Sequence, residues 1–151
     1  MESKIIKQLN FYYYGILFLT IISATLSYLL LMKDIVSAVD PMSQAGQIIQ
    51  YIIIFDVLIS VPCGLWLHKR NCKRLAKVED ETIQLTDYKK SATERILLVG
   101  HGMVIAIFAF YLMGAYMSML WVAAISAIGW YFTKPTEKKL YFELHPQDEQ
   151  Y

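Results

Sequence analysis

The sequence has little charge, little cysteine and none of the common motifs of soluble enzymes. Only 18% of its 151 residues are charged and 56% are hydrophobic, which excludes an ordinary soluble domain and indicates an integral membrane protein. A net charge of +1 gives no sign of a nucleic-acid partner. Phosphate-binding glycine loops, Gly-x-Ser-x-Gly, His-Glu-x-x-His and Cys-x-x-Cys are all missing, so we expect no enzymatic activity.

The cysteines also exclude two kinds of cross-link. Cys63 and Cys72 would lie about 13 Å apart on one helix, which is too far for a disulfide. A metal site needs more ligands than these two thiols, so the sequence predicts neither a disulfide framework nor a metal.

Two hydrophobic runs each have the length of one membrane span. Residues 11–32 carry no charge and would form a helix of about 33 Å, matching a hydrocarbon core of ~30 Å. This run is longer than a signal-peptide core, so we expect it to be retained. Residues 48–67 contain a single charge, Asp56, and Pro62 is expected to kink the helix.

A third run is too long for one crossing. Residues 96–132 contain no Asp, Glu, Lys or Arg and would extend about 56 Å as one helix, so they must fold back. Gly114 lies near the midpoint and is the expected break, giving spans at 96–113 and 116–132. The sequence therefore predicts an all-α, polytopic integral membrane protein, with four transmembrane helices in one domain over residues 1–151.

The basic residues predict how the chain is oriented. All 14 Lys and Arg residues except Lys33 fall on one side of the four-span arrangement. The positive-inside rule assigns that side to the cytoplasm, together with both termini, and we expect a bacterial inner (plasma) membrane.

Residues 68–95 are predicted to form a helical cytoplasmic hairpin between the second and third spans. We expect the second helix to continue for about two or three turns, and a new helix to begin near Thr86 with Ser91 and Glu94 as a capping box. The polar tail, residues 134–151, either packs under this hairpin or is disordered. Five basic residues are candidates for contacts with anionic lipid or a partner protein, unless they only set topology: Lys69, Arg70, Lys73, Arg74 and Lys77.

Asp56 is the candidate polar site within the spans. It shares one helix face with Ser60 and Cys63, and we expect this face to point into the protein. No other Asp, Glu, Lys or Arg lies in the four spans, so the carboxyl group is predicted to be neutral. Two interpretations remain open: a proton- or cation-binding site, or a polar contact that holds helices together.

Two histidines, His68 and His101, are expected at a matching depth near the inner interface. Two histidines at one depth could bind haem or a metal, but a closed transition-metal site usually needs three or four ligands, and nothing in the spacing requires Cys72 to join them. We therefore expect interfacial or packing roles and no cofactor.

These observations favour a non-enzymatic accessory or scaffold subunit that packs with partner or identical subunits in the bilayer. The alternative is an oligomeric proton- or cation-coupled transporter or channel that uses Asp56.

Overall fold

The computed structural model describes residues 2–145, and this part of the chain is built from five helices and no strands. They are α1 (Glu2–Met32), α2 (Gln44–Leu75), α3 (Glu81–Leu112), α4 (Met117–Tyr131) and α5 (Glu137–Leu144). The prediction of an all-α protein is confirmed. Three helices, α1, α2 and α3, are long and apolar enough to cross a membrane, whereas α4 is apolar but has only 15 residues.

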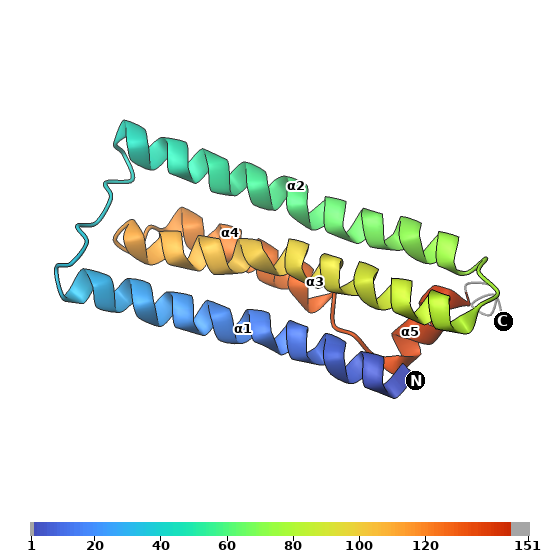
Figure 1. The fold of residues 1–151 in the computed structure, drawn as a ribbon. Helices are drawn as coiled ribbons and strands as arrows, with labels where there is room; N and C mark the ends of the chain where they lie inside the picture. Colours follow the sequence, from blue (N-terminus) through green and yellow to red (C-terminus); the bar gives the residue numbers. More distant parts are fainter. Residues whose placement is uncertain (1, 146–151) are drawn as a thin grey trace.

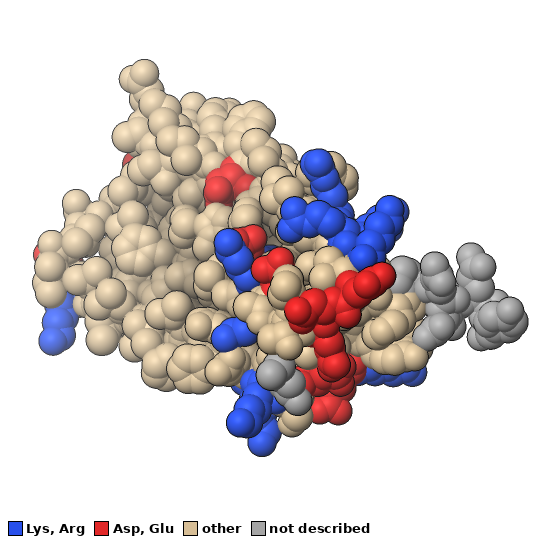
Figure 2. Space-filling view, turned by 45° about the vertical axis from the view of Figure 1, so that its right-hand side comes forward, with Lys and Arg blue, Asp and Glu red and all other residues tan. Residues whose placement is uncertain are grey.

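Helix α3 is the centre of the bundle. It packs against α1, α2 and α4, and Figure 1 shows α1 and α2 on opposite sides of α3 with α4 behind it. The N-terminus, the α2–α3 connection and α5 gather at one end, which we call the charged end (Figure 1). Lys, Arg, Asp and Glu side chains crowd this end, while the adjoining flank is largely uncharged (Figure 2).

Glycines allow α3 to lie close to its neighbours. A Cβ atom added to Gly100 would lie 2.7 Å from Ile16 of α1, and one added to Gly102 would lie 2.7 Å from Val57 of α2. Both distances are shorter than a normal carbon–carbon contact, so only a residue without a side chain fits these positions without a shift. Close approach through small residues is the usual way in which membrane helices gain packing energy.

The fold-back between α3 and α4 occurs where the sequence predicted it. Gly114 and Ala115 have φ angles of 65° and 64°, in the left-handed region that ends a helix. Chain reversal follows at once, because α4 begins at Met117 and packs against α3.

The helices at the charged end differ in part from the expectation. Helix α2 runs through Pro62 without interruption and continues to Leu75, as expected for the extension beyond residue 67. Helix α3 begins at Glu81 and not near Thr86, because the Asp80 carboxylate accepts hydrogen bonds from the Thr82 and Ile83 amides. The predicted capping box is therefore wrong, and Ser91 is a buried residue inside α3.

A hydrophobic cluster extends the core into the charged end. It joins side chains of four helices, including Leu9 of α1, Leu75 of α2, Leu85 of α3 and Leu140 of α5. Part of the polar tail is thus a packed helix beneath the bundle, one of the two states expected for it, and residues 146–151 lie outside the described part of the chain.

Candidate functional site

A half-buried carboxylate, Glu143 of α5, is the centre of a polar network at the charged end. Its Oε2 accepts hydrogen bonds from the Tyr88 hydroxyl at 2.6 Å and from His68 Nε2 at 3.0 Å. Its Oε1 pairs with Arg95 Nη1 at 3.1 Å. Tyr88 and Arg95 come from α3 and His68 from α2, so one side chain of α5 joins three helices.

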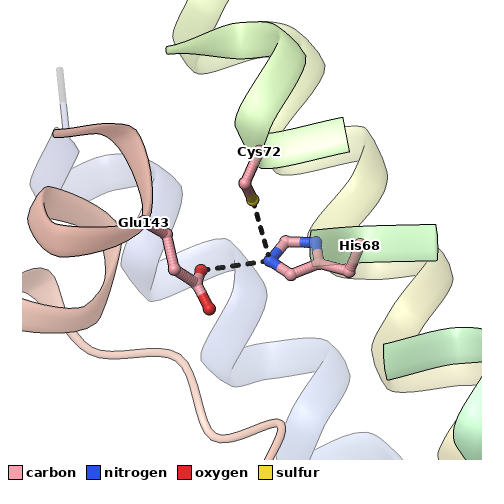
Figure 3. A group of neighbouring side chains, drawn as sticks. All are labelled: His68, Cys72 and Glu143. Carbon is pink, nitrogen blue, oxygen red and sulfur yellow. Dashed lines mark hydrogen bonds and ion pairs between the residues drawn. The ribbon is translucent and has the colours of Figure 1, made fainter. Parts of the chain in front are cut away.

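The hydrogen-bond network continues at Nδ1, on the other side of the His68 ring. Ser91 Oγ lies 3.0 Å from His68 Nδ1 and accepts a hydrogen bond from the Asn71 amide at 3.1 Å. One tautomer satisfies the contacts with Ser91 and Glu143: the Ser91 hydroxyl donates to Nδ1, and Nε2–H donates to Glu143. Cys72, one turn beyond His68 in α2, places its Sγ 3.3 Å from Nε2 (Figure 3).

Burial and these contacts change the acid–base properties of the network. Burial alone would raise the pKa of Glu143, but the hydrogen bond from His68 and the charge of Arg95 outweigh it and lower the pKa to about 2. Burial lowers the pKa of His68, and burial with the Glu143 charge raises the pKa of Cys72 to about 12. At neutral pH the network therefore holds an ionised Glu143, a neutral His68 and an unreactive Cys72 thiol.

A hollow of about 690 Å³ adjoins this network. Its cationic lining comes from Lys69 and Lys73 of α2, Arg95 of α3, and Lys138 and Lys139 of α5. Its apolar lining includes Leu65, Phe132 and Phe142. Glu143, already paired, is the one carboxylate among its lining residues. We call this cavity the basic hollow.

Three donor atoms beside the hollow have the composition of a metal site. A nitrogen of His68, the sulfur of Cys72 and an oxygen of Glu143 all lie within 4.8 Å of one another (Figure 3). A tetrahedral zinc site takes four ligands, and this group supplies three. A dication here would also have to replace the Nε2 proton of His68, and it would compete with the Arg95 guanidinium for Glu143. The arrangement works as a hydrogen-bonded ion-pair network that fastens α5 to α2 and α3.

A second polar site lies within the long apolar helices α2 and α3, where Asp56 Oδ2 and His101 Nε2 are 2.8 Å apart. This differs from the expected lack of a partner, which was based on Asp, Glu, Lys and Arg alone and left histidine out. The side chains of His101 and Asp56 are 36% and 40% exposed. The pair therefore joins α2 to α3 but is not enclosed by the helices of one chain.

The other residues of the expected Asp56 face do not complete a site. Ser60 is buried and its hydroxyl has no hydrogen-bond partner among the described residues, while Cys63 is half-buried and unpaired. Ser60 therefore makes no hydrogen bond to the Asp56–His101 pair.

His68 and His101 do not lie at a matching depth, contrary to the expectation. His101 contacts Asp56, which precedes His68 by twelve positions, or about 18 Å, along α2. The two rings cannot bind one ion or one haem, because each belongs to a different polar site.

The five candidate basic residues face different surroundings. All are exposed, but only Lys69 and Lys73 line the basic hollow. Arg70 lies over the ring of Trp66, 5.5 Å from its centroid, and Arg74 lines a separate small polar pocket with Asp87 and Glu94. Lys77 lies at the end of α2, outside both cavities.

Glu143, Tyr88 and Arg95 are site residues that were not predicted from the sequence. Arg95 gave a signal, because it directly precedes the long uncharged run from Ile96 to Phe132. Glu143 gave a weaker one, since Leu140 and Leu144 flank it at the spacing of an amphipathic helix. Comparison with known proteins adds nothing further: no family model, no curated protein and no solved structure matches this chain significantly.

Proposed function

We propose that this chain is a non-enzymatic subunit of a membrane assembly, with four spans and both termini in the cytoplasm. Support for the fourth span comes from α4, which returns the chain from the Gly114 turn to α5 at the charged end. At about 22 Å, α4 is shorter than the hydrocarbon core, a mismatch that local thinning of the bilayer accommodates. All 14 Lys and Arg residues except Lys33 favour a cytoplasmic charged end.

The Asp56–His101 pair is the observation that carries the proposed function. Each side chain is more than one-third exposed, inside segments that otherwise present apolar residues to their surroundings. Polar and charged groups facing hydrocarbon are costly and normally face protein or water. Leu97 and Ile105, one turn on either side of His101, are also exposed, so the pair lies in an open apolar face of α2 and α3.

A second copy of this chain is the partner that fits this face best. Two copies with the same orientation meet across a two-fold axis along the membrane normal, which places identical residues at the same depth. Asp56 and His101 of one copy then face His101 and Asp56 of the other. This pairing is reciprocal, and it covers both exposed polar groups without requiring a foreign residue.

Cysteine cross-linking tests this interface. Ile59 is exposed one turn from Asp56, so Ile59→Cys, with Cys63→Ser and Cys72→Ser, places one thiol on the proposed face. We expect a disulfide-linked dimer on oxidation in nanodiscs. Phe18→Cys in the same background is the control, because Phe18 is equally exposed but lies on α1. Equal cross-linking at both positions, or none at Ile59→Cys, contradicts the proposed interface.

Proton or cation transport is the second candidate, favoured by the contact of two titratable groups inside the spans. Asp56→Asn keeps the size and hydrogen-bonding capacity of the side chain but removes its ionisation. If assembly persists and ion flux in proteoliposomes is lost, transport is supported. A wild-type protein without flux under several cation and pH gradients excludes it.

A further inference from the structure

We propose that the basic hollow binds the phosphate of an anionic phospholipid headgroup. This site is separate from the Asp56–His101 face, and it relies on the proposed position of the charged end at the membrane surface but not on dimer formation.

The charge of the hollow is the first argument. Four lysines and Arg95 surround it, whereas its carboxylate, Glu143, already accepts hydrogen bonds from Tyr88, His68 and Arg95. The four lysines of α2 and α5 therefore line the cavity with no free carboxylate among its lining residues, and the Lys139 ammonium also donates to the Phe132 carbonyl. Lysine and arginine side chains that line one cavity are the usual ligands of phosphate oxygens.

Arg95 supplies an independent argument. Its side chain is only 3% exposed and lines the hollow, and its Nε–H has no acceptor among the residues that the structure describes. Arg95 thus places a cation in the wall of the hollow, where a phosphate adds to the counter-charge that Glu143 supplies.

The apolar wall distinguishes a lipid from free phosphate. Leu65 and Phe132 belong to the inner ends of the second and fourth expected spans, and Phe132 is exposed. Lys69 and Lys73 follow Leu65 by one and two turns of α2, towards the charged end. A lipid whose phosphate meets the lysines can thus place its acyl chains along the apolar residues. A cavity of about 690 Å³ also has room for more than a phosphate ion.

Matched charge variants test the site. Lys69→Gln with Lys73→Gln removes two cations from the hollow, and Arg70→Gln with Arg74→Gln removes two cations from the same helix that do not line it. The full chain is placed in nanodiscs of phosphatidylcholine with a small fraction of phosphatidylglycerol. The lipids retained by the released protein are then counted by native mass spectrometry.

We expect the wild-type chain to retain phosphatidylglycerol at least tenfold over its share in the disc. The Lys69/Lys73 variant should lose this enrichment, while the Arg70/Arg74 variant should keep it within twofold. Equal losses of enrichment in the two variants would show that the lipid is attracted by general surface charge, and would overturn the proposal. It is also overturned if the wild type shows no enrichment, or if inorganic phosphate at millimolar concentration displaces the lipid completely. None of these outcomes bears on the cross-linking at Ile59→Cys, so failure of the lipid site and failure of the dimer are distinguishable.

Discussion

Glu143 makes the polar contacts that attach α5 to the rest of the protein, beside the buried Leu140 and Leu144. Its hydrogen bonds reach His68 on α2 and Tyr88 and Arg95 on α3, and each of these partners is buried. Removal of the carboxylate would leave the Arg95 guanidinium buried without its counter-charge, which typically costs about 3–5 kcal/mol. The ionised form of this side chain therefore contributes to the attachment of α5.

Glu143→Gln is expected to expose Cys72. In a Cys63→Ser background, Cys72 should react slowly with a maleimide, because it is buried and its pKa is raised to about 12. Loosening of α5 in Glu143→Gln should increase the labelling rate at least tenfold. Glu137→Gln, the same change at an exposed position of α5, serves as the control and should have little effect. An unchanged rate in Glu143→Gln would show that this network does not hold α5.

The same carboxylate predicts how stability depends on pH. The pKa of Glu143 is about 2 in the folded protein, against 4.5 ordinarily, so its ionisation stabilises the fold above pH 4.5. That contribution, roughly 3 kcal/mol, is lost as the pH falls towards 2. The difference in free energy of unfolding between wild type and Glu143→Gln, measured in mixed micelles, should therefore shrink below about pH 4. A difference that stays constant down to pH 2 would contradict the assigned ion pair.

At the scale of the helices, local sequence signals predicted the long apolar helices and the turn between α3 and α4. Long stretches without charged residues predicted the long apolar helices, and Gly114 predicted the position of the fold-back. The turn contains a second left-handed residue, Ala115, whose side chain makes this conformation unfavourable by about 1–2 kcal/mol.

A pair of opposite substitutions tests this turn. Gly114→Ala should lower the free energy of unfolding by about 1 kcal/mol, because φ of 65° strains any residue with a Cβ. Ala115→Gly should raise it by about 0.5 kcal/mol, since relief of strain exceeds the added entropy of the unfolded chain. Both are measured by unfolding in mixed micelles, and a neutral Gly114→Ala would argue against the left-handed turn.

Contacts between residues of different helices could not be predicted from the sequence patterns. Asp56 and His101 lie 45 positions apart, and their contact depends on how α2 packs beside α3. Glu143 meets His68 across 75 positions, only because α4 returns the chain to the charged end. Periodicity and spacing describe single helices, so the sequence identified Asp56, His68 and His101 but not the partner of each.

At the scale of the whole molecule, charge and apolar surface are divided along the long axis. The charged end carries the network and the basic hollow, the opposite end carries Lys33, Asp34 and Asp40, and the length between the two ends presents mainly apolar side chains (Figure 2). The Asp56–His101 pair is an exception, since it puts two half-exposed polar groups within this apolar length. A membrane subunit that buries this pair against a second copy explains the apolar length as well as the polar pair within it.

The mass of the assembly in nanodiscs tests that account most directly. We expect the wild-type protein to contain two copies of the 17.5 kDa chain. Asp56→Leu combined with His101→Leu removes the polar groups that the second copy covers, and should yield a single copy. A wild-type protein with the mass of one chain, or a Leu/Leu variant that stays dimeric, would contradict assembly through this face.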